Sequence, residues 1–498
     1  MLSVKQRVFK THLAISLETL VPPDNFYRQV QSKLDLDFVR GLVAERYSAL
    51  GRPSIDPVVF FKLHLIMFFE GIRSERQLVE MVNLRLDHRW YLGYDLDEVV
   101  PDHSSLTKIR DRYGVTIFQA FFERILTLCV EAGLVWGKEL YVDATMLEAN
   151  ADYERQVPRL TQSAQEHVQE LFTPHDNLAL HQQLLNKYNG SQLTPPKKGY
   201  QRLADEQVSL TDPSATTVGH QRLGYRLHYG VDGGKARIVL HCLVTPASVQ
   251  DNTPMLDLVW WAWFRWQLPL KVVVGDTRYG TIDNIVALER TGIRAFFPLH
   301  SEAARQGSRE HCFPADAFHY DPQMDCYICP QGQPLTYVRT DAKQQRHLYK
   351  APAKVCRACP LYSKCSPSPR GRQLSHSIFK AILDRVQTYA TTRAYQKAMR
   401  KRAVWIEPRF ADLKLWHHGR RFRLRGLLKV NIEALLKATG QNIQQLLKTK
   451  TPGKLLHPAQ AMAVTPYPYL KFFALLIPFL IFNATFSTLW TVFLVNYG

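Results

Sequence analysis

Between residues 136 and 309, short apolar runs alternate with helical segments, and this alternation constrains the fold more than any other feature. The order is a strand at residues 140–143, a hairpin turning at residues 232–234, a helix, a strand at residues 271–274, a second helix and the short strand "IRAFFPL". Such an order predicts an α/β fold with a mixed sheet flanked by helices.

Two of the predicted strands lead into acids. The first ends at Asp143, and "KVVVGD" turns on Gly275 into Asp276. If the two strands are neighbours, both carboxylates reach the edge of the sheet where α/β proteins bind ligands. Like charges this close repel unless cations neutralise them, and hard oxygen ligands suit Mg²⁺. A pair of such ions suits in-line phosphoryl displacement. The alternative for Asp276 alone is a cap on the following turn.

A third acid, Glu407, lies in the most basic stretch of the chain. Residues 393–429 hold twelve Lys and Arg against two acids, and the whole chain has a net charge of +19 with a pI near 9.5. This excess favours a polyanionic partner, with nucleic acid ahead of an anionic membrane. Glu407 is therefore a candidate metal ligand beside a phosphate track. An ordinary helical salt bridge is the alternative.

Residues 1–135 predict a helical domain. "DPVVFFKLHLIMFFEGI" is an apolar helix, Ser74 caps "SERQLVEMVNLRL", and Ser104 or Ser105 caps the helix in "PDHSSLTKIRDRYG". Short connections and a final basic helix fit a helix-turn-helix-like DNA-binding unit, and a plain helical bundle fits nearly as well.

Five of the eight cysteines fall in one 40-residue window. Cys326 and Cys329 form one CxxC pair, and Cys356 and Cys359 form a second pair 26 residues later. Two such pairs predict a structural zinc site within residues 310–375, with Cys365 as a spare ligand. Reduced structural thiols are the alternative.

The remaining segments have less defined roles. Residues 155–222 predict a polar insertion, and residues 376–450 predict helices at 378–402, 404–416 and 427–448. Residues 451–498 form an apolar tail without charge from position 472 onward, which fits a docking segment, a membrane anchor or a disordered tail. The first 25 residues lack the apolar core of a secretory signal.

The sequence resembles bacterial insertion-sequence transposases of the DDE class from about residue 15 to 450. The resemblance rests on "GRPSIDPVVFFKL", "GIRSERQLVEMV", "VDATMLEANAD", "VTPASVQDN", "GDTRYGTIDNIVALE" and "WIEPRFADLKLWHHGRRFRLRG", which occur in this order. It implies a ribonuclease-H-like core at residues 136–309, completed by residues 376–450, and a DNA-binding domain at residues 1–135. By the same resemblance Asp143, Asp276 and Glu407 are the metal-binding catalytic triad.

The resemblance also implies an activity. The chain would cleave DNA and transfer the freed strand with Mg²⁺ or Mn²⁺, bound as a homo-oligomer to element ends and target DNA at the bacterial nucleoid. Arg402 and Lys414 would support the triad. In the family's tyrosine–arginine–glutamate–lysine signature, however, the arginine position is Ala403 here, and Tyr395 is displaced from the expected tyrosine spacing. Two alternatives remain open: a metal-dependent nuclease without strand transfer, and a domesticated, non-catalytic DNA-binding protein.

Several further residues have predicted roles. Glu148 and Asp152 are candidates for an outer shell around the metals, Asp232 fits the hairpin turn, and Asp251 fits a helix cap. The predicted phosphate contacts are arginines of the basic stretch: Arg420, Arg421, Arg423 and Arg425.

Overall fold

The computed structural model describes residues 15–48, 50, 54–152, 154–158, 207–217, 223–299, 312–366 and 368–449. Contacts divide the chain into residues 1–450 and 451–498. The predicted apolar tail and most of the predicted 155–222 insertion lie outside the described residues. The flanks of that insertion pair as a two-stranded sheet of β2 (Gln156–Pro158) and β3 (Gln207–Ser209).

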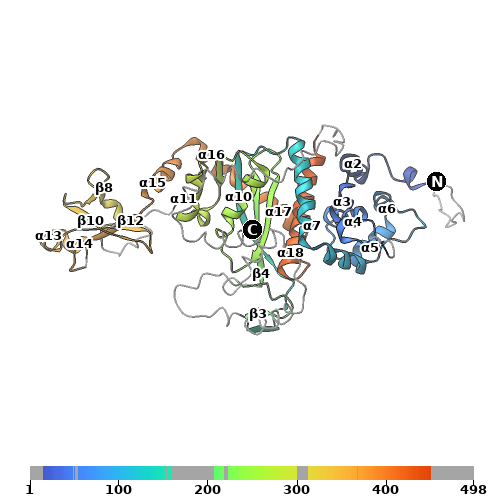
Figure 1. Cartoon of the computed structure of the whole chain (residues 1–498), viewed down its shortest axis with the longest axis horizontal. Coiled ribbons are helices and arrows are strands. Elements are labelled where there is room, and N and C mark those ends of the chain that lie inside the picture. Colours follow the sequence, from blue (N-terminus) through green and yellow to red (C-terminus); the bar gives the residue numbers. More distant parts are fainter. Residues whose placement is uncertain are drawn as a thin grey trace, which may run out of the picture. The chain divides into compact units, whose positions relative to one another are not determined.

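Helices form the N-terminal region, as predicted (Figure 1). They are α1 (Leu17–Leu20), α2 (Phe26–Lys33), α3 (Phe38–Val43), the 3₁₀ turn η1 (Ala44–Arg46), α4 (Pro57–Phe69), α5 (Glu75–Leu84), α6 (Leu86–Leu92) and α7 (His103–Glu131). The cap of α4 is Asp56, whose side chain accepts from the Val58 N–H, and Ser74 caps α5 as predicted. Because α4 is apolar on nearly every side, it lies in the core.

Helix α7 differs from its prediction in two respects. Its cap is Asp102, which accepts from the Ser104 N–H at 2.8 Å, so the helix begins before the predicted serines. Gly114, with φ of 64°, kinks it. Among the described residues it is the one helix long and apolar enough to cross a membrane, and about half of that apolar segment is buried in the protein.

The predicted mixed sheet is present, in the order β5-β4-β1-β6-β7. Its strands are β1 (Glu139–Glu148), β4 (Gly224–Asp232), β5 (Val239–Pro246), β6 (Val272–Val274) and β7 (Arg294–Phe296). The first strand does not end at Asp143 as predicted. It pairs with β4 from Leu140 to Glu148, while its parallel pairing with β6 covers only residues 139–141. Asp143 therefore lies just beyond the end of the parallel pairing.

Helices cover this sheet and complete its edge. They are α10 (Met255–Trp266), α11 (Ile282–Arg290), α15 (Lys380–Tyr389), α16 (Arg393–Trp405), α17 (Glu407–Leu415) and α18 (Leu427–Leu447). Two buried asparagines of α18 satisfy the edge strand β5. Asn431 bonds both the N–H and the C=O of Val244, and Asn442 does the same for Val239.

A second five-stranded sheet lies in the chain between β7 and α15, with the order β12-β11-β10-β9-β8. Its strands are β8 (His319–Asp321), β9 (Cys326–Ile328), β10 (Pro334–Asp341), β11 (Arg346–Lys350) and β12 (Gln373–Ser377), accompanied by the 3₁₀ turn η4 (Ala315–Ala317), α13 (Ala353–Arg357) and α14 (Tyr362–Cys365). Its separate core consists of Phe318, Tyr327, Leu335, Tyr349, Ala351 and Leu374.

Candidate active site

Two aspartates meet at the carboxyl edge of the central sheet. Strands β1 and β6 are parallel neighbours, and Tyr141 pairs with Val274. Asp143 lies two residues after Tyr141, and Asp276 lies two residues after Val274. The backbone therefore brings the two aspartates to matching positions. The condition that their two strands are neighbours is therefore met.

The surroundings of Asp143 disfavour its charged form. The pKa of Asp143 is raised to about 6, mainly by burial and also by the charges of Asp276 and Asp251, against the lowering effect of Arg402. Nη1 of Arg402 donates to Oδ2 of Asp143 at 3.0 Å, and the Ala144 N–H donates to Oδ1 at 2.9 Å. The site thus concentrates negative charge that a single guanidinium only partly balances.

Asp276 also acts as a cap. Its Oδ1 accepts from the Arg278 N–H at 2.8 Å and begins the 3₁₀ turn η3 (Thr277–Tyr279). No other hydrogen bond joins its carboxylate to a described residue. The cap interpretation is therefore correct, and it leaves the second carboxylate oxygen of Asp276 available for a ligand.

Asp251 departs from its predicted role. It was expected to cap α10, but α10 begins after Pro254 without a side-chain cap. Asp251 is instead buried, with one oxygen on Arg226 and the other 2.9 Å from Arg278. Its position after β5, which runs in the same direction as β1, was the available signal.

Helices α16 and α17 contact the same face of β1. Arg402 bonds Asp143, and Nζ of Lys414 donates to Oγ1 of Thr145 at 2.6 Å. Glu407 begins α17 between them, exposed, and makes no hydrogen bond or ion pair with a described residue. Because seven residues are nearly two helical turns, Glu407 and Lys414 share the helix face that Lys414 directs toward β1. Tyr395, by contrast, packs on Phe296.

The three acids do not yet form a metal site. In the described part of the chain, no group of three His, Cys, Asp or Glu side chains has the geometry to hold an ion. Glu148 lies five residues along β1 from Asp143, about 16 Å at about 3.3 Å per residue, and so falls outside the predicted outer shell. Asp152 follows Glu148 and bonds the Glu154 N–H. Asp232 accepts from Trp136, Gly137 and Gly234, as a turn residue.

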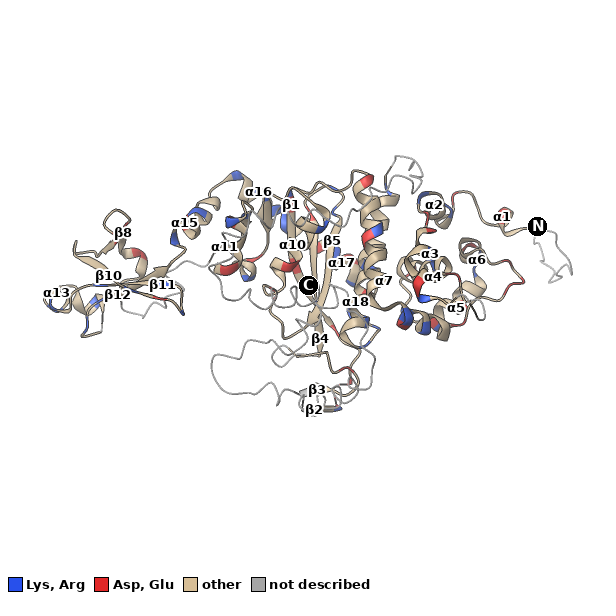
Figure 2. Cartoon of the chain, in the orientation of Figure 1, with Lys and Arg blue, Asp and Glu red and all other residues tan. Residues whose placement is uncertain are grey.

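The predicted phosphate contacts divide into two groups. Lys and Arg recur along α16 and in the segment before α18 (Figure 2). Arg420, Arg421 and Arg425 are exposed, and residues 420–422 bond Glu148 as an extension beside β1. Arg423 instead donates to Glu75 at 2.8 Å. Buried Arg110, in the predicted basic helix, pairs with the same Glu75, so both arginines form ion pairs within the protein.

The cysteines group differently from the prediction. Cys329, Cys356, Cys359 and Cys365 line one cavity, whereas Cys326 is buried within β9 between its neighbours β8 and β10. Side chains alternate between the two faces of a strand, and in β9 this places Cys326 on a buried face. Cys329 lies in the turn after the strand. Cys365, the predicted spare ligand, therefore lines the cavity with the other three cysteines, and Cys326 does not.

Two family models match the sequence. One, described as a transposase domain (DUF772), matches residues 15–112, and the other, described as a transposase DDE domain, matches residues 328–447. No curated protein matches the chain. The first match covers the helices from α1 into α7, and the second runs from the end of β9 through Glu407 to the end of α18. Transposase families bind DNA, and the DDE domain is that of an enzyme acting on it. Together the two matched regions support an insertion-sequence transposase of the DDE class.

Proposed function

We propose that the chain cleaves DNA at the ends of its own insertion sequence and joins the freed strands to target DNA, with Mg²⁺ or Mn²⁺ held by Asp143, Asp276 and Glu407. The observation that carries this proposal is the matched position of Asp143 and Asp276, each two residues beyond the paired Tyr141 and Val274. The order β5-β4-β1-β6-β7, with β4 antiparallel, supports a ribonuclease-H-like core.

The residues at this edge fit a hard divalent cation. The donors are carboxylates, and the raised pKa of Asp143 reflects burial beside other negative charge, which a cation would relieve. When bound there, the metal would lower the pKa of water and stabilise charge on the phosphate under attack. Asp143 and Asp276 would hold it from the sheet, and Glu407 would close the site from the start of α17.

Two basic side chains, Arg402 and Lys414, contact residues of β1 beside the carboxylates. Arg402 partly balances the charge of Asp143 and keeps that carboxylate oriented. Lys414 is anchored by Thr145, two residues along the same strand face, and burial lowers its pKa. Both would hold phosphate oxygens of a DNA strand that lies across the carboxylates.

The rest of the DNA track would be the exposed arginines beside β1. Nε of Arg421 donates to the Ala149 carbonyl at 3.0 Å, and Nε of Arg425 donates to the Asn150 carbonyl at 2.8 Å. These bonds orient the two side chains, while both remain exposed. Pre-oriented guanidinium groups suit phosphate oxygens, and such contacts position DNA without reading its sequence.

The test is an in vitro reaction on the DNA that flanks the gene. A supercoiled plasmid carrying both flanks is incubated with the protein and Mg²⁺, and strand breaks and joined products are mapped by sequencing. We expect breaks at one fixed nucleotide on each side and joined strands in target DNA. Breaks without joining would assign a nuclease, and binding without breaks would assign a non-catalytic DNA-binding protein. Either result overturns the proposal.

A further inference from the structure

The second sheet has only a small core to stabilise the packing of α13 and α14. Its own core contains six buried residues, and short helices α13 and α14 bring exposed polar surface with them. Small units with cores of this size usually need a disulfide or a metal for stability. All eight cysteines are free thiols, so no disulfide supplies that stability.

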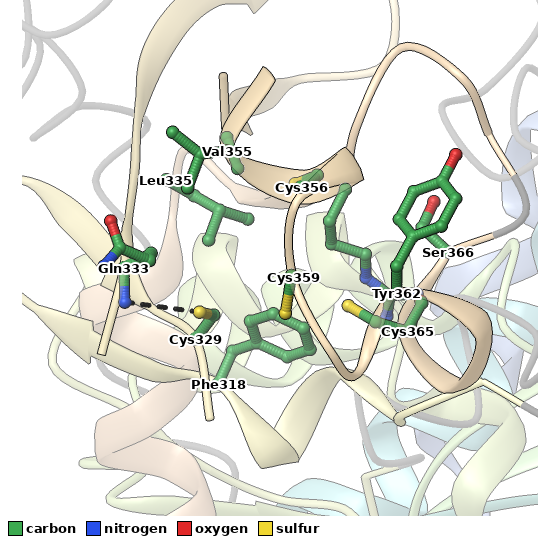
Figure 3. Close-up of a pocket in the computed structure, with 12 residues that line it drawn as sticks. Phe318, Cys329, Gln333, Leu335, Val355, Cys356, Cys359, Tyr362, Cys365 and Ser366 are labelled. Carbon is green, nitrogen blue, oxygen red and sulfur yellow. Dashed lines mark hydrogen bonds between the residues drawn. The ribbon is translucent and has the colours of Figure 1, made fainter. Parts of the chain in front are cut away.

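A small cavity separates the sheet from these helices. Its volume is about 30 Å³, and four of its lining residues are Cys329, Cys356, Cys359 and Cys365 (Figure 3). The sulfur atoms of Cys329, Cys359 and Cys365 point into the same space, with Cys356 at its edge. A cavity of this size has room for about one water molecule, which suits a single ion and excludes an organic cofactor.

The turn that carries Cys329 holds its sulfur with a backbone hydrogen bond. The Gln333 N–H donates to the Cys329 sulfur at 3.3 Å, and the Cys329 N–H donates to the Gln333 carbonyl at 2.9 Å. Gly332, with φ of 72°, allows this tight turn. The turn therefore fixes the position of Cys329, which lines the cavity.

The four thiols are also close enough to affect one another. All four line the same cavity, and Cys329, Cys356 and Cys365 also pack against the core of the second sheet. Four thiols that would repel one another once ionised, around a cavity of ionic size, form a donor set that a soft-binding divalent cation would neutralise.

We propose that Cys329, Cys356, Cys359 and Cys365 bind one structural zinc ion, and that Cys326 is not a ligand. Four thiolates around one ion match the closed tetrahedral sites of structural zinc. As noted above, no described group already has metal-binding geometry, so the ion would draw the thiols inward by side-chain rotation. Binding would release the thiol protons and fasten α13 and α14 to the sheet.

Zinc binding would also affect the helices that carry the candidate catalytic residues. Strand β12 ends at Ser377, and α15 begins three residues later, followed by the helices that carry Arg402 and Glu407. Zinc would order the module from which these helices start. It would not take part in the reaction itself, because its four positions are filled by sulfur.

The first experiment measures metal content and uses matched variants. Full-length protein purified under reducing conditions should contain about one zinc per chain by mass spectrometry of the metal. Cys365→Ser should lose the zinc, whereas Cys326→Ala and Cys312→Ser should retain it. Zinc that remains in Cys365→Ser and is lost from Cys326→Ala would overturn the ligand set, and protein without zinc would overturn the site.

The second experiment needs no variant, in case a substitution prevents folding. X-ray absorption of the wild-type zinc protein should show four sulfur neighbours at about 2.3 Å. Fewer than four sulfurs would contradict the proposal. Chelation should then expose the 312–377 segment to protease, and unchanged cleavage would show that the metal is not structural.

Discussion

At the residue scale, Glu75 joins three parts of the chain that are distant in sequence. It begins α5, pairs with Arg110 of α7, and accepts from Arg423 of the basic stretch. Burial alone would raise its pKa, but the charges of Arg423 and Arg110 lower it to about 2. One carboxylate thus holds the N-terminal helices against the segment beside β1.

Glu75→Gln should lower the free energy of unfolding by about 3–5 kcal/mol, because it leaves buried Arg110 without its counter-charge. Urea unfolding measures this, with Glu80→Gln as the control. Glu80 pairs with Arg76 at 3.4 Å on an exposed surface, so its loss should cost less than about 1 kcal/mol.

The pH dependence gives an independent check on the same residue. Because the folded pKa is depressed, the stabilisation is complete above the ordinary value of 4.5 and is lost as the pH falls toward about 2. The difference between wild type and Glu75→Gln should shrink over that range. A difference that does not change between pH 5 and pH 2.5 would mean that the ion pairs do not stabilise the fold.

At the element scale, α18 supports the sheet by replacing a missing strand. Strand β5 is the edge of the sheet, and its outward N–H and C=O groups at Val239 and Val244 have no strand partner. Asn442 and Asn431 each satisfy one pair of these groups with a side-chain amide. An amide has both a donor and an acceptor, which an apolar side chain cannot supply.

Asn442→Ala should therefore destabilise the protein by about 2–6 kcal/mol, since two buried backbone groups lose their partners at about 1–3 kcal/mol each. Thermal unfolding of the full chain is the measurement. Thr439→Val, which removes one bond to the Leu435 carbonyl within α18, is the matched control. Equal shifts for the two variants would contradict the role of the edge bonds.

Much of this element order could be predicted, because strand and helix periods and their flanking residues are local signals. The helices at 57–69 and 427–447 and the hairpin turn at Asp232 follow from them. The extension of β1 to Glu148 could not be predicted, since pairing with β4 sustains it. The predicted helix at 378–402 is two helices, because Thr392 caps a second one.

The candidate site was predictable in part for the same reason. Two acids at the expected ends of strands, together with the family resemblance, indicated Asp143 and Asp276, although β1 continues past Asp143. Asp251, Arg423 and the exchange of Cys326 for Cys365 depend on which side chains meet after folding. CxxC spacing treats both members of a pair alike, although strand alternation buries Cys326 and leaves Cys329 in the turn.

At the scale of the whole molecule, the net charge of +19 predicts that DNA binding depends on salt. Changing Arg420, Arg421 and Arg425 to Ala should weaken binding to all sequences alike. The slope of log affinity against log salt should fall by about 0.9 for each lost phosphate contact. Exposed Arg339, on β10, is the control. An unchanged slope in the triple variant would remove these arginines from the DNA track.

The central claim is that three acids from separate parts of the chain form one cleavage site. Mg²⁺-dependent nicking of the flanking DNA, measured beside DNA binding, tests it in Asp143→Asn, Asp276→Asn and Glu407→Gln. The control is Asp283→Asn, an exposed acid at the start of α11. We expect each of the three variants to bind DNA normally without nicking it, because each removes a metal-binding charge and little volume, while the control nicks normally. Nicking that persists in Asp143→Asn or Asp276→Asn would contradict the site, and nicking that persists in Glu407→Gln would remove Glu407 from it.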